Sequence, residues 1–175
     1  MHRLILASCL AGALVPSAHA SAATDENQIV AGWEHCVVNV PTWDRLNIRD
    51  EPKSGGKIVT RLGYGECGIS VTGDCEADWC PVEIGNSVGW ANARFIASVS
   101  PAMYCINTNL REGDTLPLRA YPSELSGVVL AMPSDQCTIS AMPYSVQGWQ
   151  KIRVESEEGT ERHEGWIPWG FLVGQ

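Results

Sequence analysis

The chain has 175 residues, 45% hydrophobic and 18% charged, and its 20 acidic and 12 basic side chains give a formal net charge of −8. An acidic surface repels nucleic acids and anionic membranes, so neither is expected as a partner.

The first twenty residues are typical of a secretory signal peptide. A short basic start at residues 2–3 precedes an apolar run from Leu4 to Val15, and Ala18-His19-Ala20 forms a small-residue cleavage signal. We expect cleavage after Ala20 and a location in the periplasm or outside the cell. The apolar run is too short to span a bilayer and no later segment is longer, so we expect no integral membrane protein. Lipidation at Cys9 is the alternative.

Residues 21–32 are small and polar, which predicts a disordered tail before the first folded unit. From residue 33 to residue 98 the pattern changes to short β segments separated by Gly, Pro and Asp. Strands of four to six residues at this spacing predict a small barrel. The expected strands are Cys36–Val40, Leu46–Arg49, Ile58–Leu62, Gly68–Thr72, Trp79–Ile84 and Val88–Ala91.

Residues 103–175 repeat this unit. Arg49, Cys67 and Trp79 recur 70 positions later, and Gly89-Trp90 and Phe95-Ile96 recur 76 positions later. A repeat in register predicts two copies of one fold. The expected strands of the second copy are Tyr104–Asn107, Leu116–Arg119, Val128–Ala131, Thr138–Ala141, Trp149–Val154 and Gly165–Pro168.

Two segments connect these strands. Ala97–Ala102 has little apolar content and is the expected boundary between the copies. The six extra residues of the second copy fall within Glu155–Glu164, which reads as a long acidic hairpin tip. It is either an ordinary surface loop or a docking element for a basic partner.

Six cysteines remain once Cys9 leaves with the leader. An even number in an exported protein predicts disulfides, and units of about 70 residues need such staples because their cores are small. Cys36 and Cys105 are equivalent, as are Cys67 and Cys137, so symmetry predicts the bonds Cys36–Cys67 and Cys105–Cys137. Cys75 and Cys80 are then left to form a hairpin clip.

The two copies resemble the bacterial SH3-like (SH3b, SH3 type 3) domain family over nearly all of the mature chain. The first copy carries Leu46-Asn47-Ile48-Arg49-Asp50-Glu51-Pro52, Asp78-Trp79-Cys80-Pro81-Val82, Gly89-Trp90-Ala91 and Phe95-Ile96. The second carries Leu116-Pro117-Leu118-Arg119-Ala120-Tyr121-Pro122, Gly148-Trp149-Gln150-Lys151-Ile152, Gly165-Trp166-Ile167 and Phe171-Leu172. The resemblance implies an all-β chain of two tandem small SH3-like β-barrels, stapled by disulfides. Family members are mostly non-catalytic, and many target cell walls or bind envelope proteins.

Exposed aromatic side chains are the main candidates for ligand contact, because they offer large contact areas at small entropic cost. The candidate set is Trp43, Asp50, Trp79, Tyr121, Trp149, Glu157 and Glu158. We expect Trp90 and Trp166 in the cores and Trp169 in a structural role. Arg49 and Arg119 are expected to brace their turns.

No set of residues for catalysis is visible in the sequence. Only His35 and His163 remain after cleavage, and there is no Gly-x-Ser-x-Gly motif or phosphate-binding loop. We therefore expect no enzyme, no metal site and no cofactor.

The expected function is binding of a cell-envelope ligand, either peptidoglycan or an envelope or secreted protein. The alternative is an acidic inhibitor or immunity protein that blocks a basic secreted enzyme, for which the negative charge and the Glu155–Glu164 loop are the reasons. A third possibility is a structural subunit whose groove is covered by a neighbour.

Overall fold

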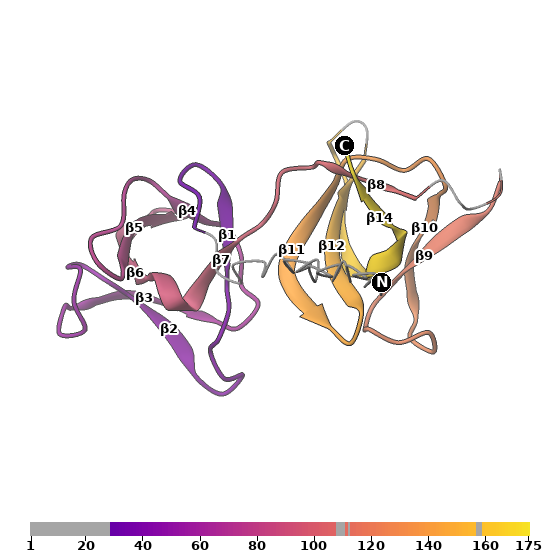
Figure 1. Ribbon diagram of the computed structural model, residues 1–175. Helices are drawn as coiled ribbons and strands as arrows, with labels where there is room; N and C mark the ends of the chain where they lie inside the picture. The colour runs from indigo at the N-terminus through magenta and orange to yellow at the C-terminus, as the bar shows by residue number, and fades with distance from the viewer. Residues whose placement is uncertain (1–28, 108–110, 112, 157–158) are drawn as a thin grey trace, which may run out of the picture.

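The computed structural model describes residues 29–107, 111, 113–156 and 159–175. The expected signal peptide and residues 21–28 of the expected tail lie outside this range. The described chain is all β apart from two short 3₁₀ helices, and it folds into two modules that lie side by side (Figure 1). None of its described helices has the length and apolar character needed to cross a bilayer.

The first module is an antiparallel sheet that curls around its own core. Within the described residues the sheet has seven strands in the order β3-β2-β6-β5-β4-β1-β7. A short 3₁₀ helix, η1 (Ala93–Phe95), precedes the last strand. The strands are β1 (Glu34–Val37), β2 (Arg45–Arg49), β3 (Ile58–Gly63), β4 (Ile69–Val71), β5 (Trp79–Ile84), β6 (Ser87–Asn92) and β7 (Ile96–Ser98).

The second module repeats this topology. Its described strands follow the order β10-β9-β13-β12-β11-β8-β14, which is the same path through the equivalent elements. The helix η2 (Trp169–Phe171) takes the place of η1. The strands are β8 (Tyr104–Ile106), β9 (Thr115–Arg119), β10 (Val128–Pro133), β11 (Ile139–Val146), β12 (Trp149–Glu155), β13 (Arg162–Pro168) and β14 (Leu172–Gly174).

Each module has its own hydrophobic core, built from the inward-facing residues that alternate with outward-facing ones along its strands. Ile48 and Leu118 occupy equivalent places at the two centres and are fully buried. An arginine comes directly after each of these two residues and braces the turn that follows. Arg49 donates from Nη1 to the Gly56 carbonyl at 2.6 Å, and Arg119 donates to the Ser126 carbonyl at 2.7 Å. The expected bracing role of the two arginines is therefore confirmed.

The six cysteines form the three predicted disulfides. Cys36–Cys67 and Cys105–Cys137 each tie the first strand of a module to the loop before its fourth strand. Cys75–Cys80 closes a separation of 5 residues in the first module only. Three disulfides fit an oxidising compartment, such as the periplasm or the extracellular space.

The structure corrects the sequence-based elements in four places. Strand β11 continues to Val146, five residues beyond the expected end at Ala141. The short closing strands β7 and β14 were not expected. Residues 97–99 of the expected connector belong to β7 or are buried, because Ala97 and Val99 pack between the modules. Residues 29–32 of the expected disordered tail are also anchored: Ile29 packs on the first core, and the Gly32 amide donates to the Val71 carbonyl at 3.0 Å.

Candidate functional site

A bulge in strand β11 joins the two modules. Ala141 pairs with Ile152 and Ser145 with Gln150, so three residues of β11, Met142 to Tyr144, lie opposite one residue of β12. Such a bulge redirects side chains that would otherwise follow the pleat, and it tolerates the proline at its centre. Gln150 is buried and donates from Nε2 to the Met142 carbonyl at 2.5 Å and towards the Tyr144 carbonyl at 3.2 Å. The side chain of Gln150 thus replaces ladder bonds that the bulge removes.

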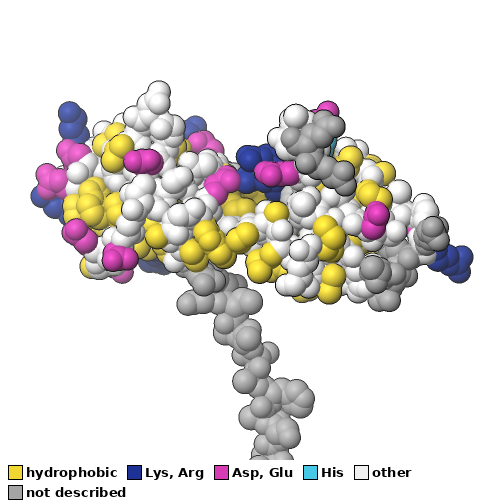
Figure 2. Space-filling model, turned by 90° about the horizontal axis from the view of Figure 1, so that it is seen from above, with side chains coloured by type: hydrophobic (Ala, Val, Ile, Leu, Met, Phe, Trp, Pro, Cys, Tyr) yellow, Lys and Arg dark blue, Asp and Glu magenta, His cyan; other side chains and the backbone are white. Residues whose placement is uncertain are grey.

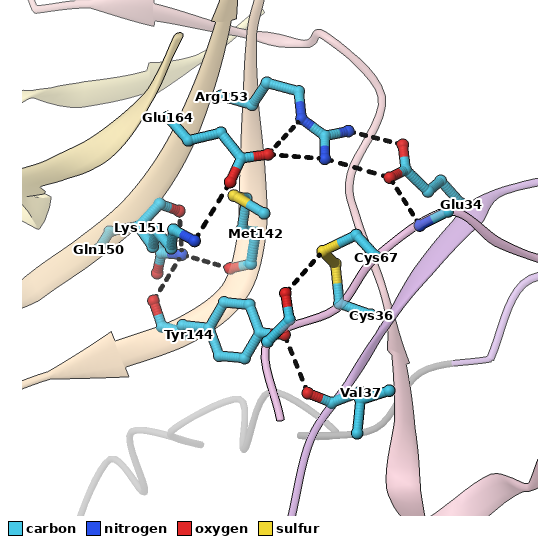
Figure 3. The surroundings of a disulfide bond; sticks show 12 residues. Glu34, Cys36, Val37, Cys67, Met142, Tyr144, Gln150, Lys151, Arg153 and Glu164 are labelled. Atoms are coloured by element: carbon cyan, nitrogen blue, oxygen red, sulfur yellow. Dashed lines mark hydrogen bonds and ion pairs between the residues drawn. A yellow bond between two sulfur atoms is a disulfide. The ribbon is translucent and has the colours of Figure 1, made fainter. Parts of the chain in front are cut away.

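Met142 and Tyr144 of the bulge pack against the first module. They share a buried cluster with Cys36, Val38, Ala97 and Val99. The Tyr144 hydroxyl donates to the Val37 carbonyl at 2.9 Å (Figure 3). The Tyr144 ring meets the Tyr64 ring edge to face, with 5.5 Å between their centroids. Burial, followed by the proximity of Tyr64 and Glu164, raises the pKa of Tyr144. The phenol therefore stays protonated and serves as a structural donor.

A second contact between the modules is ionic. The Arg153 guanidinium is buried and binds both carboxylate oxygens of Glu34, at 2.6 and 3.1 Å, and it also binds Glu164 (Figure 3). Lys151 approaches the other oxygen of Glu164 at 3.2 Å. Burial alone would lower the pKa of Arg153 and raise that of Glu164. The hydrogen bonds of Arg153 to Glu34 and Glu164, and those of Glu164 to Arg153 and Lys151, outweigh this effect of burial. The pKa of Arg153 is therefore raised and the pKa of Glu164 is lowered.

The backbone completes the joint. Beyond β7, the Ser100 amide donates to the Ala141 carbonyl at 2.9 Å, and the Ala141 amide donates back to Ser100 Oγ at 2.7 Å. The chain that leaves the first module thus pairs with the edge of β11. The buried cluster, the ionic contact and this pairing all restrict the orientation of the two modules.

A groove of about 1080 Å³ lies along this joint and is lined by residues from both modules. Figure 2 shows the notch between the two lobes, with hydrophobic side chains beside a basic and acidic pair. Six aromatic residues line the groove. Trp33 and Tyr64 come from the first module, and Tyr144, Trp149, Trp166 and Trp169 come from the second.

None of the side chains that line the groove is Asp, Glu, Lys, Arg or His. The polar lining consists of amides and hydroxyls, and among these Asn39, Ser145 and Gln147 are exposed at the rim. Trp169 is 48% exposed, and its amide donates to the Gly148 carbonyl at 2.8 Å, which fixes η2 against the β11–β12 turn. The site is therefore an uncharged concave surface on an acidic molecule.

The structure brings one predicted candidate, Trp149, into this groove. Trp79, its counterpart, lines a smaller pocket of about 360 Å³ in the first module, together with Arg45 and Phe95. Trp43 is 88% exposed in the loop after β1, and Tyr121 is 72% exposed in the turn after β9. These four aromatic residues therefore do not form one surface.

The polar candidates have other surroundings. The Asp50 carboxylate accepts the Lys57 amide at 2.7 Å within the braced turn of the first module. Glu157 and Glu158 lie outside the described residues. Of their neighbours, Glu155 pairs with Arg162 at 3.0 Å, and Glu164 belongs to the ionic contact between the modules.

Sequence reasoning missed most of the groove. Trp33, Tyr64 and Tyr144 were not among the candidates, and Trp166 and Trp169 were expected in structural roles only. One signal was available in the repeat: positions 142–148 read Met-Pro-Tyr-Ser-Val-Gln-Gly where the first copy has Thr-Gly-Asp-Cys-Glu-Ala-Asp. A segment that turns from acidic to apolar between two copies indicates a new contact.

The comparisons with known proteins are sparse. No family model and no curated protein matches the chain. Among solved structures, NlpC2 from Trichomonas vaginalis is similar with a TM-score of 0.35 and 12% identity, covering 82% of this chain and 48% of that chain. NlpC1 from the same organism has a TM-score of 0.35 and 13% identity, with 82% and 46% covered. This chain thus spans less than half the length of each.

Proposed function

We propose that this chain is an exported, non-catalytic protein of two tandem SH3-like β-barrels that binds peptidoglycan in the groove between them. The observation that carries the proposal is the uncharged groove with six aromatic side chains drawn from both modules. Ligand sites are concave and mostly apolar, with a few convergent polar groups, and this groove has that composition.

The rigidity of the joint supports the same proposal. The Arg153 contact, the Tyr144 hydrogen bond and the buried cluster hold the two walls in one arrangement before any ligand arrives. A preformed site loses less conformational entropy on binding than one that must assemble. The aromatic walls are stiff as well, since Trp and Tyr have few rotatable bonds.

The repeated topology supports the barrel assignment. Both sheets curl around a core and have the same strand order. In both, the Gly-Trp pair lies on the strand that pairs antiparallel with the second strand of the module. These features match the motifs by which the sequence resembles SH3-like domains. The assignment is tested by an experimental structure of the mature chain.

The function is tested by co-sedimentation of the oxidised mature protein with intact peptidoglycan sacculi at physiological ionic strength. We expect the protein to pellet, and we expect Trp149→Ala and Trp169→Ala to reduce pelleting at least about tenfold. Trp43→Ala is the matched control, because this tryptophan is exposed but lies outside the groove. Protein that stays in the supernatant would refute wall binding. Loss of pelleting only in Trp43→Ala would place the binding site at Trp43 and not in the groove.

The acidic inhibitor remains the second candidate, favoured by the net charge of −8 and the exposed Glu161. Ion pairs reduce its support, because Glu155 and Glu164 already contact basic side chains of the same chain. Inhibition of a basic wall-degrading enzyme that weakens steeply with salt would establish this function instead.

A further inference from the structure

We propose that the groove binds the uncharged sugar backbone of its ligand and not the charged peptide part. This inference deepens the proposed function and rests on it. It concerns the chemical class that the groove accepts: a short oligosaccharide of neutral, N-acetylated or hydroxyl-bearing sugars.

The first argument is electrostatic. Peptides of the cell wall carry free carboxylates and amines, and a charged group that enters a partly enclosed site must exchange its water for a charged or hydrogen-bonding partner. The groove offers no ionisable partner apart from the phenols of Tyr64 and Tyr144. Two basic side chains of the joint, Arg153 and Lys151, are already bound to Glu34 and Glu164. A charged peptide would therefore lose hydration without compensation.

The second argument is the match of surfaces. A pyranose ring presents a face of C–H groups and a rim of hydroxyl or acetamido groups. Aromatic faces bury the first, and amides or hydroxyls hydrogen-bond to the second. Trp149, Trp166 and Trp169 supply the apolar wall, and Ser145 and Gln147 lie at its edge. Within the part of the chain that the structure describes, neither of these two side chains makes a hydrogen bond, so both have donors and acceptors to offer a ligand.

The third argument comes from the repeat. Gln147 and Ala77 occupy the same position in equivalent tight turns, and both have positive φ, 47° and 50°. The backbone is thus alike, but only the copy that borders the groove carries an amide there. Likewise Ser145 stands where the first copy has the disulfide-bonded Cys75. The second copy thus has an amide (Gln147) and a hydroxyl (Ser145) beside the groove, where the first copy has a methyl group (Ala77) and a disulfide (Cys75).

The groove is also large enough for more than one sugar. Its volume of about 1080 Å³ slightly exceeds the usual range for ligand sites, roughly 300–1,000 Å³. Binding of a single sugar would leave much of the aromatic wall uncovered. We therefore expect affinity to rise with oligosaccharide length.

The test is calorimetric titration of the mature protein with two probes: a neutral hexamer of N-acetylglucosamine and a sugar-free wall stem peptide. We expect the hexamer to bind and the peptide not to bind, with the hexamer's Kd nearly unchanged between low and high salt because no charge is involved. Trp149→Ala should weaken hexamer binding at least about tenfold, and Gln147→Ala about three- to tenfold. Because Ala77 tolerates the same backbone conformation, Gln147→Ala keeps the fold, and Trp43→Ala should bind like the parent.

Sacculi distinguish failure of this inference from failure of the proposed function. If the protein pellets with intact sacculi but binds the stem peptide and not the hexamer, the glycan assignment is wrong and wall binding stands. If the protein binds the hexamer but does not pellet with sacculi, the glycan assignment stands and the natural glycan is not that of the cell wall. Binding to neither probe nor to sacculi overturns both.

Discussion

At the scale of single residues, the glycines before Trp90 and Trp166 are required by the close approach of two strands. A Cβ on Gly89 would lie 2.6 Å from the Arg49 carbonyl oxygen and 2.9 Å from Ile48 Cγ2. A Cβ on Gly165 would lie 2.7 Å from the Arg119 carbonyl oxygen. Backbone atoms cannot yield as the end of a flexible side chain would. The Gly-Trp pair is therefore a packing requirement of each module.

We predict that Gly89→Ala and Gly165→Ala each lower the free energy of unfolding by about 1–3 kcal/mol, the usual cost of overpacking. Urea unfolding measures the effect. Gly55→Ala is the control, because a Cβ there meets nothing within 4 Å, and its stability should be unchanged or slightly raised. Equal stability of Gly89→Ala and Gly55→Ala would contradict this account.

His35 makes the stability of the first module depend on pH. Its side chain is fully buried, and its Nε2 accepts the Val30 amide at 3.2 Å. Burial lowers the pKa of His35, outweighing the opposite effects of nearby carbonyls and of Glu34. The pKa of His35 is about 6.5 in the unfolded chain and lower in the folded protein. Between these two pKa values the unfolded chain binds more protons than the folded protein. The contribution of His35 to stability is therefore fully present above about pH 6.5 and is lost as the pH falls below this value.

We therefore expect unfolding free energies from urea titrations to fall as the pH is lowered from 7 towards 5. His35→Gln should flatten this part of the profile, because a neutral amide does not titrate. His163→Gln should keep the slope, since the His163 side chain is one-third exposed beside Glu161 and is not part of the buried core. A profile that His35→Gln leaves unchanged would rule out this residue as the cause.

At the scale of elements, strand β11 and its counterpart show how one repeat supports two local structures. The segments 67–79 and 137–149 have equal length, and each ends in a tight turn before a tryptophan. In the first copy the Cys75–Cys80 disulfide closes the end of this segment and the residue after it into a small loop. In the second copy the absence of the two cysteines lets β11 extend and bulge at Pro143. The bulge turns Met142 and Tyr144 towards the first module.

The disulfides should differ in their contribution to stability. In the chain-entropy model, cross-linking a separation of 32 residues contributes about 3–4 kcal/mol, and one of 5 residues contributes about 2 kcal/mol. We expect Cys105→Ser/Cys137→Ser to destabilise its module by more than Cys75→Ser/Cys80→Ser. Urea unfolding under oxidising conditions measures both. A larger effect of the short clip would show that this loop contributes packing that the chain-entropy model leaves out.

At the scale of the whole molecule, the joint between the modules contains one buried cation. The Arg153 side chain is 5% exposed, and the two carboxylates that it binds are 29% and 34% exposed. Removing the guanidinium would leave Glu34 without its cationic partner and Glu164 with Lys151 alone. Breaking a fully buried pair costs about 3–5 kcal/mol, and partial exposure of the carboxylates reduces this.

We predict that Arg153→Met lowers the free energy of unfolding by about 2–3 kcal/mol and loosens the joint. Faster proteolysis at Ala97–Ala102 and a larger radius of gyration in solution scattering would report the loosening. Arg162→Met is the matched control. The side chains of Arg162 and its partner Glu155 are 56% and 43% exposed, so the change should be within about 0.5 kcal/mol. If both variants behave alike, the Arg153 contact does not hold the modules together.

The properties common to both copies could be predicted from the amino-acid sequence. The register of Arg49, Cys67 and Trp79 with their counterparts predicted two β modules and the two equivalent disulfides, because a repeat constrains the positions that each copy needs to fold. The third disulfide, Cys75–Cys80, was predicted as the remaining pair. Most expected strands lie within two or three residues of those observed. The same reasoning predicted Trp149 as a candidate but grouped it with Trp79, Trp43 and Tyr121, which lie elsewhere.

The groove was decided only by the tertiary structure. It depends on positions where the copies differ, such as Tyr144 in place of Asp74 and Arg153 in place of Glu83. A repeat by itself does not indicate which face of one copy meets the other. That choice follows from the bulge of β11, the short path from β7 to β8, and burial of an arginine between two glutamates. Folding within each module is local to its repeat, whereas docking brings together residues more than 100 positions apart, as in the Tyr144–Val37 and Arg153–Glu34 contacts.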